Sequence, residues 1–101
     1  MIIEESDFRL IPESETTPRF DLELLYTVKP RGGEARTEFK PCGYSITLEY
    51  AMKKIAHFRI NQKHKDEAVR LLDYFNEFKK ELENLKKLCK IVDIPINEDP
   101  N

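Results

Sequence analysis

The chain of 101 residues is long enough for one hydrophobic core but not for two. Hydrophobic residues make up 40% of it and aromatic residues 10%, which favours a folded chain over a disordered one. The net charge of -2 excludes a strongly basic protein, so nucleic-acid binding would have to come from a local patch. We predict a single α+β domain over residues 1–94 and a flexible C-terminal tail over residues 95–101.

Two cysteines, Cys42 and Cys89, are too few for a disulfide scaffold, and their spacing matches no zinc pattern. No apolar run approaches the roughly 18 residues that a membrane span needs, and the N-terminus has no secretory-signal pattern. We therefore expect reduced thiols, a cytoplasmic location, and neither a cofactor nor a metal.

The first half of the chain predicts three strands. Residues 8–11 form a short apolar segment that Pro12 ends. Residues 20–29 alternate apolar and mostly polar side chains, which is the clearest strand pattern in the sequence. After a Gly-Gly turn, residues 35–40 alternate again until Pro41. These segments predict a three-stranded antiparallel sheet.

The second half predicts two helices. Ser45 and Thr47 are both N-cap candidates for a first helix over residues 47–60, whose apolar residues keep helical spacing. A long helix is predicted over residues 66–91, with acids at its start and lysines near its end, as the helix dipole favours. Helices joined by a short link normally pack antiparallel, and we expect this pair to pack on the sheet.

Apolar residues of the long helix recur at alternating spacings of three and four from Ala68 to Val92, which is the pattern of a narrow buried stripe. We expect the first half of the stripe, residues 71–78, to belong to the protein's own core. The second half is expected to contact a partner or a second copy in a homodimer. Its residues are Leu82, Leu85, Cys89 and Val92. The alternative is that the whole stripe packs within its own chain.

No acid lies between Glu49 and Asp66, whereas five fixed positive charges do: Lys53, Lys54, Arg59, Lys63 and Lys65. A phosphate backbone or an acidic protein surface could dock on such a segment. The alternative is a solvated helix face that the acidic N-terminal region neutralises, because no helix-turn-helix or RNA-binding motif accompanies the charges. The acids from Glu4 to Glu23 suggest the opposite idea, a surface that imitates nucleic-acid charge.

Residues suited to catalysis are few. The only histidines, His57 and His64, are seven residues apart and have no neighbouring residues that complete a metal-ligand set. The glycines at positions 32 and 33 lie in no phosphate-loop pattern. We therefore expect a protein that is not an enzyme.

Two segments carry a resemblance: FDLELLY over residues 20–26 with its Gly-rich turn, and GYSITLEYA over residues 43–51 with its basic helix. They resemble small uncharacterised proteins of bacteriophages and integrated elements in Gram-positive bacteria, over roughly residues 8–88. The resemblance implies an accessory protein in the host-cell cytoplasm that binds host or defence components, anti-CRISPR inhibition included. It carries over no functional residues, because both motifs are structural.

The expected function is therefore protein–protein binding by a non-enzymatic α+β module. The alternative is a nucleic-acid-binding accessory protein that uses residues 53–65.

Overall fold

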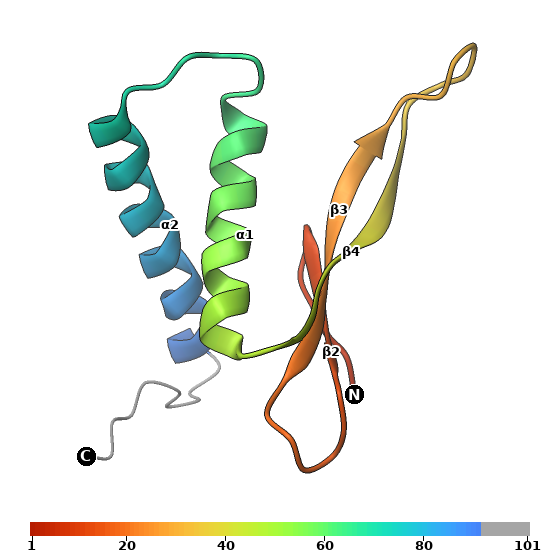
Figure 1. Ribbon diagram of the computed structural model, residues 1–101, viewed down its shortest axis with the longest axis vertical. Helices are drawn as coiled ribbons and strands as arrows, with labels where there is room; N and C mark the ends of the chain where they lie inside the picture. The colour runs from red at the N-terminus through yellow and green to blue at the C-terminus, as the bar shows by residue number, and fades with distance from the viewer. Residues whose placement is uncertain (92–101) are drawn as a thin grey trace. The chain divides into compact units, whose positions relative to one another are not determined.

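The computed structural model describes the backbone of residues 1–91 and the side chains of residues 1–88. It confirms an α+β protein with an antiparallel sheet and two helices (Figure 1). The elements are β1 (Ile3–Glu4), β2 (Phe8–Pro12), β3 (Phe20–Val28), β4 (Arg36–Ile46), α1 (Leu48–Lys63) and α2 (Leu71–Ile91). The chain divides into two compact units, Met1–Ala51 with the sheet and Met52–Asn101 with most of the helical residues. The single domain over residues 1–94 stays a prediction, and the tail over 95–101 lies outside the described residues.

The sheet unit is an antiparallel meander in the order β1-β2-β3-β4. Phe8 lies opposite Leu24, and Leu10 lies opposite Leu22, so these four side chains share one face of the sheet. All four are buried, as the alternation predicts for β3. At about 25 cal/mol per Å² of buried apolar surface, this face is a main source of stability for the unit.

Arg9 organises the other face of the sheet. Its guanidinium lies 3.2 Å from the Glu4 carboxylate and 3.5 Å from that of Glu23, which stands directly opposite it on β3. The same group lies 3.9 Å from the centre of the Phe39 ring. Two of the N-terminal acids are therefore paired within the sheet.

The sheet has four strands rather than the three predicted. The additional strand, β1, pairs Ile3 with Leu10 and Glu4 with Arg9, and its two residues are too short for any periodicity. β4 also continues to Ile46, beyond the predicted end at residue 40. It is an edge strand, where proline is tolerated. Two shifts in the β3–β4 register accommodate the extra residues as bulges.

The beginning of α1 follows the predicted capping pattern. The hydroxyl oxygen of Thr47 accepts a hydrogen bond from the Tyr50 backbone N–H at 3.2 Å, which is the N-cap arrangement. Ser45, the other candidate, has a φ of 53° and donates its hydroxyl hydrogen to Glu13 at 3.0 Å. Thr47 is therefore the residue that caps α1.

The link between the helices lies later in the chain than predicted. α1 continues to Lys63 instead of residue 60, and α2 begins at Leu71 instead of residue 66. Asp66 has a φ of 64°, a left-handed conformation that does not continue a right-handed helix. The Glu67 N–H donates to the His64 carbonyl at 3.0 Å, which closes a tight turn after α1. The predicted start of the long helix is thus a turn.

Candidate functional site

α1 and α2 run side by side (Figure 1), and side-chain contacts join them. The Arg59 guanidinium lies 3.5 Å from the Glu81 carboxylate, and the Lys63 ammonium lies 3.3 Å from that of Glu77. In these two ion pairs, the later residue of α1 contacts the earlier residue of α2, so the helices are antiparallel, as predicted. A third contact joins His57 Nδ1 and the Tyr74 hydroxyl at 2.9 Å.

These contacts show which side of α2 faces α1. Tyr74, Glu77 and Glu81 follow one another at spacings of three and four residues, and therefore lie on one side of the helix. The covered side chains of the described part of α2 form one face: Tyr74, Glu77, Phe78, Glu81, Leu82 and Leu85. The Tyr74 and Phe78 rings stack on it at 5.8 Å between centroids. Polar and aromatic residues thus form much of the covered side.

Apolar side chains are exposed at the beginning of α2. Leu71 is 82% exposed, Leu72 67% and Phe75 52%. Positions three and four apart on a helix are surface neighbours, so the three form one continuous patch, which we call the α2 apolar face. At the border of this face, the Lys79 ammonium lies 5.1 Å from the centre of the Phe75 ring. The expectation that residues 71–78 lie in the core is wrong for Leu71 and Phe75. Phe75 lies on another side of α2 than Tyr74, Glu77 and Glu81, whereas Leu71 is the first residue of the helix and precedes the residues that contact α1.

The second half of the predicted stripe is placed differently. Leu85 is only 3% exposed, so the single chain already buries it and leaves no surface there for a partner. Leu82 is half-buried. The side chain of Cys89 and all of Val92 lie outside the described residues. Homodimer formation itself stays a prediction.

The five cations of the predicted basic segment do not share one surface. Arg59 and Lys63 form the ion pairs with α2, whereas Lys53 and Lys65 are exposed and Lys54 is half-buried. Lys54 and Arg59 are five residues apart, which at about 100° per residue places them about 140° apart around α1. A phosphate backbone would therefore not meet all five charges on one face.

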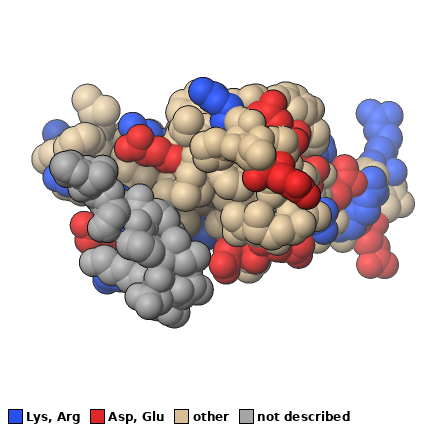
Figure 2. Space-filling model, turned by 90° about the horizontal axis from the view of Figure 1, so that it is seen from below, with Lys and Arg blue, Asp and Glu red and all other residues tan. Residues whose placement is uncertain are grey.

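Acids of the N-terminal region have structural partners in the sheet unit. Asp21 accepts the Ser45 backbone N–H at 3.0 Å, and Arg19 donates to the Ser45 carbonyl at 2.9 Å. With the Glu13 contact, three side chains thus hold Ser45 in its left-handed conformation. Figure 2 shows acidic and basic side chains interspersed on the face that it presents. This arrangement gives little support to an imitation of nucleic-acid charge.

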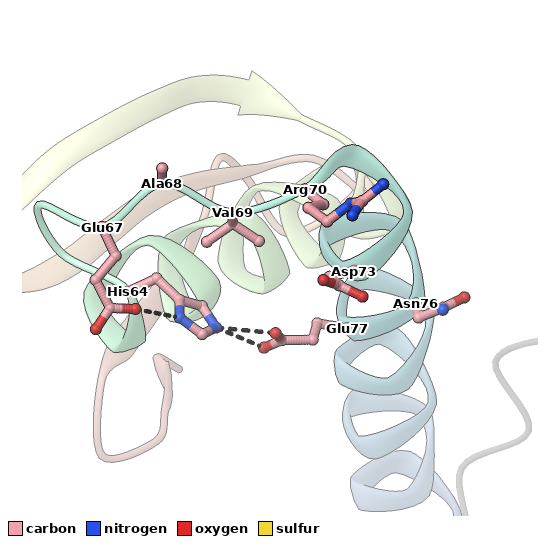
Figure 3. A pocket seen from close by; sticks show the side chains of 8 residues that line it. All are labelled: His64, Glu67, Ala68, Val69, Arg70, Asp73, Asn76 and Glu77. Carbon is pink, nitrogen blue, oxygen red and sulfur yellow. Dashed lines mark hydrogen bonds and ion pairs between the residues drawn. The ribbon is translucent and has the colours of Figure 1, made fainter.

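A pocket of about 370 Å³ lies between the link and the first turns of α2, open to solvent. His64, Glu67 and Val69 border it from the link, and Asp73 and Glu77 from the helix (Figure 3). Ala68, Arg70 and Asn76 complete its lining. The Val69 side chain points into the hollow, and the His64 ring lies between two carboxylates.

Both ring nitrogens of His64 are occupied. Nδ1 lies 2.9 Å from the Glu67 carboxylate, and Nε2 lies 2.8 Å from that of Glu77. The hydrogen bonds to Glu67 and then Glu77 raise the pKa of His64 above its usual 6.5. The hydrogen bond from His64, with one from Lys63, lowers the pKa of Glu77 below its usual 4.5.

This histidine site was not predicted, although one of its contacts has a local signal. His64 and Glu67 are three residues apart, a spacing that a turn can bring together. Glu77 is thirteen residues away, and only the antiparallel return of α2 brings it to the ring. The cluster of His64, Glu67 and Glu77 therefore becomes visible only once the antiparallel packing of the two helices is known.

Comparisons with protein-family models, curated protein sequences and solved structures find no match. Among the side chains that the structure describes, no group of three or more His, Cys, Asp or Glu residues could hold a metal ion. Neither described helix combines the length and the apolar character needed to cross a membrane.

Proposed function

We propose that this chain is a non-enzymatic protein-binding module and that the α2 apolar face is its contact surface. The observation that carries the proposal is the exposure of Leu71, Leu72 and Phe75 side by side on a described helix. Scattered apolar residues are normal on protein surfaces, whereas neighbouring large ones are typical of a surface that a partner covers. An amphipathic helix contributes affinity in the same way when its apolar side meets a partner's groove.

The biological setting that we propose is that of a phage or mobile-element accessory protein that inhibits a host or defence component. The resemblance of residues 20–26 and 43–51 is its only support. The contact surface is argued from exposure alone and does not depend on this setting.

The test is affinity capture from a bacterial host lysate with tagged wild type and a Leu71→Ser/Phe75→Ser variant. Both positions are exposed, so the fold should survive the substitutions. If the two side chains anchor the interface, we expect each loss to weaken binding by about thirtyfold, or about 2 kcal/mol. Partners captured by wild type should then be absent from the variant, and titration with a purified partner should give the affinity change.

The matched control is Lys80→Ser/Asn84→Ser, which changes two exposed positions on another side of α2. Far-UV circular dichroism of all three proteins should confirm equal helix content. Equal loss of partners in both variants, or unchanged capture by Leu71→Ser/Phe75→Ser, would contradict the proposed surface.

The alternative, nucleic-acid binding through residues 53–65, rests on the exposed cations that remain on and after α1. Two of the five charges are in ion pairs with α2, so we expect at most weak binding with a shallow salt dependence. Fluorescence anisotropy with labelled DNA and RNA at low salt measures it. Strong binding that Lys53→Glu/Lys65→Glu abolishes would favour the alternative over the protein-binding proposal.

A further inference from the structure

His64 stands where α1 gives way to the link. Its backbone N–H donates to the Ile60 carbonyl at 3.0 Å, which continues the hydrogen-bonding of the helix, while its carbonyl accepts from Glu67. Its ring contacts Glu67 in the link and Glu77 on α2 (Figure 3). One side chain thus connects the end of α1, the link and the second helix.

The two contacts require a particular protonation state. An ionised carboxylate only accepts hydrogen bonds, so each ring nitrogen must carry a hydrogen to donate to its partner. A neutral imidazole has one N–H, whereas an imidazolium has two. Both contacts therefore form together only when His64 is positively charged.

Other charged groups border the cluster. Lys63, on α1, lies 3.3 Å from Glu77 and shares that carboxylate with His64. Arg70 on the link and Asp73 on α2 line the same pocket, so one cation and one anion flank the cluster at its open side. Among the described side chains, the carboxylates of Glu67 and Glu77 contact the ring, and both favour its charged form.

We propose that His64 is a proton-operated clamp that holds the link between α1 and α2 when it is charged and releases one of its two carboxylates when it is neutral. The released partner is either Glu67, which frees the turn, or Glu77, which frees the first turns of α2. The switch depends on histidine, the side chain whose ordinary pKa lies closest to neutral pH.

The direction of the pH effect follows from the two pKa shifts. The pKa of His64 is raised, so its stabilising effect is complete below 6.5 and is lost as pH rises through the higher value of the folded state. The pKa of Glu77 is lowered, so its effect is complete above 4.5 and is lost as pH falls through the lower value of the folded state. The clamp is therefore most stable between these limits, and on the alkaline side it opens as His64 loses its proton.

The clamp also has a consequence for binding, which rests on the proposed function. The residues between its two carboxylates, from Glu67 to Glu77, include the whole α2 apolar face. A looser link would order this face less well and weaken partner binding as pH rises. The clamp itself can be tested without any partner, so failure of the binding proposal leaves its test intact.

The test is an NMR titration of the His64 ring between about pH 5 and 8, with amide hydrogen exchange measured over residues 65–70. Exchange rates are corrected for the intrinsic effect of pH. We expect the His64 midpoint to fall in Glu77→Gln and in Glu67→Gln, and protection of the Glu67 amide in wild type to fall as the ring loses its proton.

The matched control is Glu81→Gln, which neutralises an acid four residues further along α2 that pairs with Arg59 instead. It should leave the His64 midpoint unchanged. A His64→Asn variant should remove the pH dependence of protection in the link. Two results would overturn the clamp: a midpoint that is equal in wild type, Glu77→Gln and Glu67→Gln, or link protection in wild type that does not vary with pH.

Discussion

Two residues determine where α1 begins and ends. Thr47 caps the first turn of α1 through its hydroxyl oxygen. Asp66 adopts a left-handed conformation, which directs the chain away from the helix axis after the last turn of α1. Thr47 was recognisable in the sequence because a hydroxyl residue preceded a helical pattern. The prediction of a helix start at Asp66 is wrong, because the same side chain suits a helix start and a left-handed turn.

Thr47→Ala removes the acceptor for the Tyr50 backbone N–H and leaves that donor to water. We expect the substitution to lower the free energy of unfolding by about 1 kcal/mol. Urea titration followed by circular dichroism measures the change. Thr16→Ala, in an exposed loop, is the control and should change stability by less than about 0.5 kcal/mol. Equal effects of the two substitutions would exclude a capping role.

At the scale of the element, α2 shows how far spacing alone can predict a buried face. The alternating three- and four-residue pattern correctly identified a helix, but Leu85, which was expected to contact a partner, is buried within its own chain. It did not identify the side toward α1, because Glu77 and Glu81 meet Lys63 and Arg59 there. Ion pairs across helices carry no apolar periodicity, so the exposed beginning of the stripe could not be predicted.

The two halves of the stripe should respond differently to the same substitution. Leu85→Asp places a charge at a position that is 3% exposed, and we expect it to destabilise the helical unit by about 3 kcal/mol or more. Leu71→Asp changes a position that is 82% exposed and should leave the helix content and the unfolding midpoint almost unchanged. Circular dichroism with urea titration compares them. Similar stability of the two variants would contradict this placement of α2.

β4 illustrates a second limit at the same scale. The sequence predicts that the strand ends before Pro41, which is the normal inference when the position of a strand in its sheet is unknown. The strand order places β4 at an edge, where proline is tolerated, and bulges carry it on to Ile46. The identity of the edge strand is a property of the whole sheet and has no signal within residues 36–46.

For the whole molecule, composition and patterning were sufficient to predict the α+β class and the antiparallel sheet. Composition and patterning were not sufficient to predict which charged and apolar residues lie on an exposed surface. Charged residues that looked like a basic patch separate into an interhelical set, with Arg59 and Lys63, and an exposed set, with Lys53 and Lys65. Which charges meet each other depends on contacts between distant residues, and these decide which surface stays open to a partner.

The most direct test of the α2 apolar face replaces Leu72 with photoreactive benzoylphenylalanine and irradiates the protein in a bacterial host lysate. The same replacement at Lys80, exposed on another side of α2, is the reference. We expect a discrete cross-linked product from position 72, lost when Leu71→Ser and Phe75→Ser are added, and none from position 80. Equal products from both positions, or a product from position 80 alone, would contradict a contact surface formed by Leu71, Leu72 and Phe75.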